Sequence, residues 1–284
     1  MTTFSIAGLQ LEGPNGDNVE LMVGEIDAIV DRFPWVDMIV CPELSACGTV
    51  PEKAISKAAS IYACFQEVAK QHNIWLVPGS VFVQDGAEVF NEAPVISPDG
   101  EIVTRHRKLF PFTPYEKGVT PGDQHTVFDV PGIGRFGVSI CYDMWFPESI
   151  RSLIWAGAEI ILHPTLTSTI DRDAETAMVR AHAAQNQCYF FDVNLAGKVG
   201  VGESLVAGPG GEVIYKAGKG REIFPLKLDL EYLRDVRRHG WQNLGQPLKS
   251  FRDSKLTYPQ YETDGRSVAL DSLGPLKMAA RRLS

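Results

Sequence analysis

The chain has 284 residues, of which 44% are hydrophobic and 22% are charged, as in an ordinary globular protein with a buried core. Its 27 basic and 35 acidic residues give a formal net charge of −8, which argues against a nucleic-acid-binding surface. The first residues lack a charged leader before an apolar run, and no stretch approaches the roughly 20 apolar residues that span a bilayer, so we expect neither a signal peptide nor a membrane partner.

Cysteine usage indicates the compartment. Five cysteines are an odd number, they are irregularly spaced, and no two form a C-x-x-C pair. This pattern is typical of free thiols in a reducing compartment, so we predict a cytoplasmic protein. The sequence also has no metal-ligand spacing, and we expect neither a metal nor a cofactor.

The first half of the chain alternates apolar runs with helical patterns. Asp17 is the expected N-cap of the first helix. Residues 110–125, rich in proline and glycine, predict a long loop, and such loops inside compact domains are usually functional. The predicted strands are 4–9, 37–41, 74–77, 80–84, 89–96 and 101–107, and the predicted helices are 17–33 and 55–72.

The second half continues with further strands and two more helices. Pro147 is expected in the first turn of the first of these helices. The predicted strands are 126–130, 135–140, 158–162, 188–193, 203–207, 212–216 and 222–228, and the predicted helices are 147–157 and 173–187.

The order of these elements indicates the fold class. β-α-β units mixed with adjacent strands predict a layered α/β fold with sizeable sheets rather than a simple doubly wound sheet. No linker or repeat divides the chain, so we predict a single domain over residues 1–284. Residues 240–284 have weaker periodicity and are expected to form a C-terminal tail that packs on the body or on a partner subunit.

Cys141 is the candidate nucleophile. It follows a predicted buried strand and precedes a proline-led helix, and a tight strand-to-helix turn lifts a side chain out of the sheet beside free backbone N–H groups. From position alone the alternative is buried filler, which is the more common role of a free cysteine. The other cysteines lack this setting and are interpreted as filler; they are Cys41, Cys47, Cys64 and Cys188.

A cysteine nucleophile usually needs a base. Of the six histidines, only His163 lies at a strand end, and a structural role is the commoner one for such a residue. Glu43 follows a buried strand and a proline; it is either a site residue at the sheet edge or a solvated loop charge. Lys108 follows the strand 101–107, where a lone lysine is usually solvated.

Three segments resemble the signature regions of the nitrilase superfamily of carbon–nitrogen hydrolases. They are residues 41–45 (CPELS), 107–111 (RKLFP) and 141–148 (CYDMWFPE), and they occur in the family's order. Further matches lie at 184–189, 193–197, 202–204 and 209–212, so the resemblance spans about residues 4 to 230. The resemblance implies a four-layer α-β-β-α sandwich and a homodimer or higher homo-oligomer, with helices 147–157 and 173–187 at the interface.

The resemblance also implies a Glu-Lys-Cys triad of Glu43, Lys108 and Cys141, and a second glutamate, Glu116. Cys141 would attack the carbonyl carbon to form a thioester, with Glu43 as base and then acid. Lys108 and the backbone N–H of Tyr142 would hold the oxyanion. Glu116 would position substrate or Lys108 and support the protonation state of Glu43.

The residues after the nucleophile indicate the branch of the family. Nitrile-cleaving members commonly have Trp-Glu there, whereas Tyr142-Asp143 is similar to amidase-type branches. Many members carry an arginine where this chain has Trp145, so we predict a small neutral or apolar amide as substrate rather than an ω-amidic acid. Tyr115, Trp145 and Thr165 are the candidate pocket residues. A nitrilase and a catalytically inactive binding protein are the alternatives.

Overall fold

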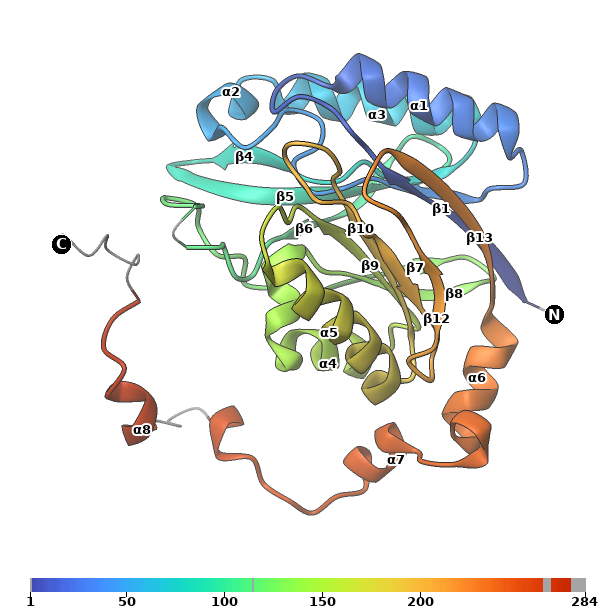
Figure 1. Ribbon diagram of the computed structural model, residues 1–284, viewed down its shortest axis with the longest axis vertical. Coiled ribbons are helices and arrows are strands. Elements are labelled where there is room, and N and C mark those ends of the chain that lie inside the picture. The colour runs from blue at the N-terminus through green and yellow to red at the C-terminus, as the bar shows by residue number, and fades with distance from the viewer. Residues whose placement is uncertain (1, 114, 263–266, 277–284) are drawn as a thin grey trace.

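The computed structural model describes residues 2–113, 115–262 and 267–276, and it contains two β-sheets packed face to face (Figure 1). Helices pack on the outer face of each sheet. The architecture is therefore a four-layer α-β-β-α sandwich, which confirms the predicted fold class.

The first sheet has the strand order β13-β1-β2-β3-β5-β4, and β6 pairs with β5. Strands β1, β2 and β3 run parallel to one another, and β5 is antiparallel to both β3 and β6. The strands are β1 (Thr3–Gln10), β2 (Met38–Val40), β3 (Trp75–Val77), β4 (Val81–Asp85), β5 (Glu88–Ile96), β6 (Ile102–Arg107) and β13 (Glu222–Asp229).

The second sheet has the strand order β12-β11-β10-β9-β8-β7, with β8, β9 and β10 parallel. Its strands are β7 (Thr126–Val130), β8 (Gly134–Val138), β9 (Ile160–Thr165), β10 (Tyr189–Asn194), β11 (Leu205–Ala207) and β12 (Val213–Lys216). The prediction of sizeable sheets is confirmed, and both sheets combine parallel and antiparallel pairs.

The helices divide between the two outer layers. Helices α1 (Val19–Arg32) and α3 (Ala58–His72) pack on the first sheet, and α4 (Pro147–Trp155) and α5 (Asp171–Asn186) pack on the second. The remaining helical elements are α2 (Pro51–Ile55), the 3₁₀ turn η1 (Cys141–Trp145), α6 (Leu230–His239), η2 (Trp241–Asn243), α7 (Pro247–Arg252), η3 (Pro259–Tyr261) and α8 (Val268–Asp271). No helix in the described ranges is both long and apolar enough to cross a membrane.

Alternating side chains build the layers of the core. On β1, Ile6 faces the core between the two sheets, whereas Ala7 packs in the core beneath α1 and α3. On β9, Ile160 and Leu162 face the intersheet core, and Ile161 packs against α4 and α5. Successive side chains of a pleated strand point to opposite faces of the sheet, so each of these strands contributes side chains to two apolar layers.

Two local expectations need correction. The N-cap of α1 is Asn18, not Asp17, although the Asp17 carboxylate accepts a hydrogen bond from the backbone N–H of Val19 at 3.2 Å. Helix α6 lies in a stretch with no predicted element, because its sequence is highly charged and its buried face consists of only Leu230, Leu233 and Val236. Its N-cap, Asp229, also closes the preceding strand.

The tail leaves the body after α6 and runs past the helices of the second sheet (Figure 1). There Phe251 packs edge-on against Trp155 at 5.8 Å between ring centroids. The Arg151 guanidinium lies over the ring of Phe251. Residues 263–266 and 277–284 of the predicted tail lie outside the described residues.

Candidate active site

The parallel strand directions bring the three residues of the predicted triad to one edge of the sandwich. Glu43 follows β2, and Lys108 follows β6, which runs parallel to β3 because both are antiparallel to β5. Cys141 opens η1 just beyond β8 of the second sheet. These residues and Glu116 line one cavity of about 870 Å³, so the structure brings the four predicted residues together.

Lys108 lies between two carboxylates. Its Nζ donates to Glu43 Oε1 at 2.7 Å and to Glu116 Oε2 at 2.6 Å. Lys108 and Glu43 are each 2% exposed and Glu116 is 9% exposed, so water does not screen these contacts. The cluster holds a single cation between two anions, a net charge of −1 beside the thiol when both carboxylates are ionised.

Asn91 completes this cluster and was missed by the sequence interpretation. From β5, its Nδ2 donates to Glu43 Oε1 at 2.8 Å and to Glu116 Oε1 at 2.7 Å. The backbone N–H of Lys108 in turn donates to the Asn91 carbonyl at 2.9 Å. An asparagine within an otherwise buried strand was the available signal, since buried amides are retained where they have partners.

The turn that carries Glu43 is fixed by close backbone packing. The backbone N–H of Leu44 donates to Ser80 Oγ at 3.2 Å, and Leu44 itself has a positive φ of 51°. Gly79 has a φ of +80°, and a Cβ there would lie 1.8 Å from the Pro42 carbonyl oxygen. Only glycine fits this approach, which holds the loop after β3 against the turn before Glu43.

Cys141 occupies a strained turn that a buried carboxylate holds in place. Its φ is +45°, the left-handed region that non-glycine residues seldom adopt. The Asp143 carboxylate accepts from the backbone N–H of Ile140 at 3.0 Å and of Phe110 at 2.9 Å, and His106 Nε2 lies 3.0 Å from it. Asp143 thereby ties the cysteine turn to the loop that follows Lys108.

The backbone N–H of Tyr142 lies at the start of the turn η1. The first hydrogen bond of η1 runs from the Asp143 N–H to the Ile140 carbonyl, so the Tyr142 N–H precedes the bonded part of the turn. It lies one residue beyond Cys141 at the wall of the cavity.

Burial and neighbouring charges perturb the ionisable groups. Burial raises the pKa of the Cys141 thiol well above its usual range, and the Glu43 carboxylate raises it further. Burial also raises the pKa of Glu43; Lys108 opposes this effect and the charge of Glu116 adds to it. Burial alone would lower the pKa of Lys108, but Glu43, Cys141 and Glu116 together raise it well above its usual value. The resting site therefore holds a neutral thiol beside a firmly charged ammonium.

The predicted pocket residues take three different positions. Trp145 lines the cavity. Tyr115 also lines it, but it is 76% exposed and stacks on Phe112 at 5.5 Å between ring centroids. Thr165 is fully buried; its hydroxyl lowers the pKa of Cys141 by hydrogen bonding to the sulfur. His163 is fully buried too, with Nδ1 3.2 Å from Ser139 Oγ, so a structural role fits it better than pairing with Cys141.

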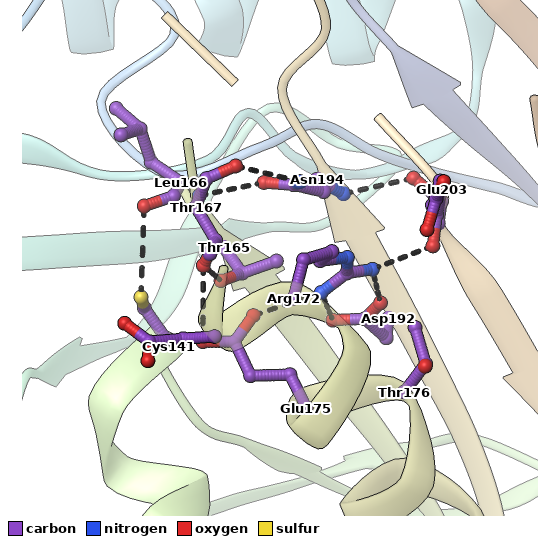
Figure 2. Close-up of polar contacts among 12 residues, drawn as sticks. Cys141, Thr165, Leu166, Thr167, Arg172, Glu175, Thr176, Asp192, Asn194 and Glu203 are labelled. Atoms are coloured by element: carbon purple, nitrogen blue, oxygen red, sulfur yellow. Dashed lines mark hydrogen bonds and ion pairs between the residues drawn. The ribbon is translucent and has the colours of Figure 1, made fainter. Parts of the chain in front are cut away.

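Another carboxylate on the cavity wall, that of Glu175 on α5, was also missed. Its Oε1 accepts from Thr167 Oγ1 at 3.0 Å, and Trp145 Nε1 lies 3.4 Å from the same oxygen. Figure 2 shows Glu175 beside Cys141, with a contact from Arg172 to the Glu175 carboxylate. The helix 173–187 was predicted, but the face that Glu175 occupies depends on how α5 meets η1.

The chain is similar to known proteins of one family. The family described as carbon-nitrogen hydrolase matches residues 10–238. The omega-amidase NIT2 of Mus musculus is 31% identical over 259 residues, which cover 84% of this chain and 93% of that protein. Two solved structures are 25% identical: Nit3 of Saccharomyces cerevisiae, a nitrilase-superfamily member (TM-score 0.77, covering 84% of this chain and 94% of that one), and a carbon-nitrogen hydrolase of Helicobacter pylori G27 (TM-score 0.78, 89% and 96%).

The fold, and the family match over most of the chain, define the protein as a hydrolase of the nitrilase superfamily. It belongs to the carbon-nitrogen hydrolase family and is an enzyme of the amidase type.

Proposed function

We propose that the protein hydrolyses small neutral or apolar amides through a thioester on Cys141, releasing ammonia or an amine and a carboxylic acid. The observation that carries this proposal is the buried Glu43–Lys108–Glu116 cluster, which lines the same cavity as the Cys141 thiol. We assign catalysis to these four residues, within one domain formed by residues 1–284.

The thioester forms in two steps. Because burial keeps the thiol neutral, Glu43 takes its proton as the sulfur attacks the amide carbon. The Lys108 ammonium and the Tyr142 N–H stabilise the oxyanion, a contribution of about 3 kcal/mol per donor in comparable sites. Glu43 then gives its proton to the departing nitrogen as the C–N bond breaks.

Hydrolysis of the thioester reverses the proton movements. Glu43 takes a proton from water, the hydroxyl attacks the carbonyl carbon, and the C–S bond breaks to release the acid. The proton returns to sulfur, so no cofactor is consumed. Glu116 and Asn91 hold Glu43 and Lys108 in register through the bonds described above.

Substrate preference follows from the cavity wall. Its apolar side chains include Leu44, Phe82, Phe112, Leu166 and Val199. They accept an uncharged acyl chain, and Trp145 offers no cation to a carboxylate. The name of the NIT2 relatives, omega-amidase, favours a second candidate, hydrolysis of an ω-amidic acid.

The test is ammonia release from a panel of amides, with pentanamide as the reference. We expect turnover of pentanamide, little from pentanenitrile, and an acyl adduct on Cys141 in acid-quenched samples by mass spectrometry. The Cys141→Ala variant should show neither ammonia nor adduct. Turnover without an adduct on Cys141 would exclude the thioester, and silence of the whole panel would favour a binding protein.

A shift of the pH profile tests the coupling between the two glutamates. The charge of Glu116 raises the pKa of Glu43, and Glu43 must be ionised to act as a base. In Glu116→Gln this repulsion is absent, so the pKa of Glu43 falls and the acid limb of the kcat/KM profile should move to lower pH. The exposed Glu101→Gln should leave the limb in place. A limb that stays fixed in Glu116→Gln would assign it to another group.

The proposed function includes an oligomeric state and a cellular compartment. We propose a homodimer or higher homo-oligomer in the reducing cytoplasm, in which the tail of residues 240–284 contacts a partner subunit in addition to the contact of Phe251 with Trp155 of its own subunit. Five free cysteines agree with such a compartment. The tail displays exposed apolar side chains that support packing on a partner: Leu244, Leu256, Val268, Leu270, Leu273 and Leu276. Sedimentation of the full chain as a monomer would contradict this assembly.

A further inference from the structure

We propose that Glu175 sets the charge selectivity of the acyl pocket, excluding acyl chains that end in a carboxylate and admitting neutral or positively charged ones. The proposal rests on the amidase function proposed above and names the substrate class of the same site.

Glu175 presents a buried carboxylate to the substrate cavity. It lies near the start of α5, is 3% exposed, and lines the cavity together with Cys141. Its Oε1 is held by the Thr167 hydroxyl and by the Trp145 indole N–H, and both of those side chains also line the cavity. The two hydrogen bonds fix the carboxylate in the wall rather than leaving it mobile in solvent.

The neighbouring cation does not cancel this charge. Arg172 Nη1 donates to Glu175 Oε2 at 3.2 Å, but the same guanidinium pairs with Asp192 and donates to the Glu203 carbonyl (Figure 2). One guanidinium thus serves two carboxylates, which leaves one negative charge in the group when both carboxylates are ionised. Arg172 is not among the residues that line the cavity, whereas Glu175 is.

In the rest of the cavity lining that the structure describes, carboxylates outnumber cations. Outside the Glu43–Lys108–Glu116 cluster, the charged side chains of the described lining are Glu12, Asp171, Glu175 and Lys198. Lys198 and Glu12 are exposed, so solvent screens them more than it screens the buried Glu175. A substrate carboxylate would therefore be repelled by Glu175 more strongly than Lys198 attracts it. A substrate ammonium would be attracted by Glu175.

The competing explanation is that Glu175 only anchors Arg172. An anchoring role predicts that removing the carboxylate lowers turnover of all substrates in the same proportion. A selectivity role predicts that the order of substrates changes with their charge. The two roles therefore differ in a ratio of kcat/KM values, which is independent of the amount of active enzyme.

The experiment uses three amides of matched length that end in methyl, ammonium and carboxylate: pentanamide, γ-aminobutyramide and succinamate. For the wild-type protein we expect kcat/KM for succinamate at least about tenfold below that for the other two. In Glu175→Gln, the ratio of succinamate to γ-aminobutyramide should rise about tenfold, while pentanamide changes less than about threefold. Asp173→Asn removes an exposed carboxylate from the same helix outside the cavity and should leave the ratio unchanged.

The outcomes separate the two levels of the proposal. An equal loss for all three amides in Glu175→Gln, or an unchanged ratio, would assign Glu175 to anchoring alone. A wild-type protein that prefers succinamate would overturn the charge selectivity while the amidase function stands, and this ranking needs no variant. Failure to hydrolyse even pentanamide would instead overturn the proposed function.

Discussion

Replacing Glu43 with glutamine is expected to lower kcat/KM for pentanamide by about a thousandfold, within the range known for loss of a general acid–base. The thiol of Cys141 is neutral at rest because burial and the nearby carboxylate raise its pKa. Glutamine keeps the shape of Glu43 and can still accept from Lys108, but its amide cannot take the thiol proton. The same group is needed again to protonate the leaving nitrogen and to activate water.

Steady-state kinetics and mass spectrometry measure this effect together. We expect the Glu43→Gln protein to fold and to show no acyl adduct on Cys141, because the attack itself is blocked. Glu101→Gln makes the same chemical change at an exposed position and should retain wild-type turnover. A Glu43→Gln protein with more than about a tenth of wild-type activity would rule out Glu43 as the base.

The strand-end positions explain why much of the site could be predicted. Glu43, Lys108 and Cys141 each follow an apolar run, and the ends of strands that point the same way meet at one edge of a sheet. The sequence alone left each residue with a commonplace alternative. The three signature segments, found in the family's order, were what indicated that Glu43, Lys108 and Cys141 belong to one site. The same resemblance implied Glu116.

What was missed depends on neighbours that sequence patterns do not specify. Asn91 joins the cluster because β5 pairs with β6, which places its amide between two carboxylates from separate loops. Glu175 reaches the cavity because α5 packs against η1. Both depend on how elements far apart in the chain pack together, whereas helical and strand periodicity reports only which face of an element is buried.

Replacing Lys108 with methionine is expected to abolish turnover and to lower the free energy of unfolding by about 3–5 kcal/mol. The variant loses the ammonium that stabilises the oxyanion. It also leaves the Glu43 and Glu116 carboxylates buried without their cation, and an uncompensated buried charge is costly. Methionine matches the length of the lysine stem, so the loss is electrostatic rather than a loss of packing.

The pH dependence of unfolding identifies the cause of that loss. Lys108 lowers the pKa of Glu43, so in Lys108→Met the folded-state pKa of Glu43 rises further above its unfolded value. A carboxyl group with a raised folded-state pKa loses stability as the pH rises through that value, so the destabilisation should be larger at pH 8 than at pH 5 in urea unfolding. Lys57→Met breaks an ion pair with Asp17 that is half exposed, and should change neither activity nor the unfolding midpoint appreciably. A Lys108→Met protein that is destabilised equally at both pH values would show that the two carboxylates do not depend on Lys108 for their charge, and that the loss comes from packing.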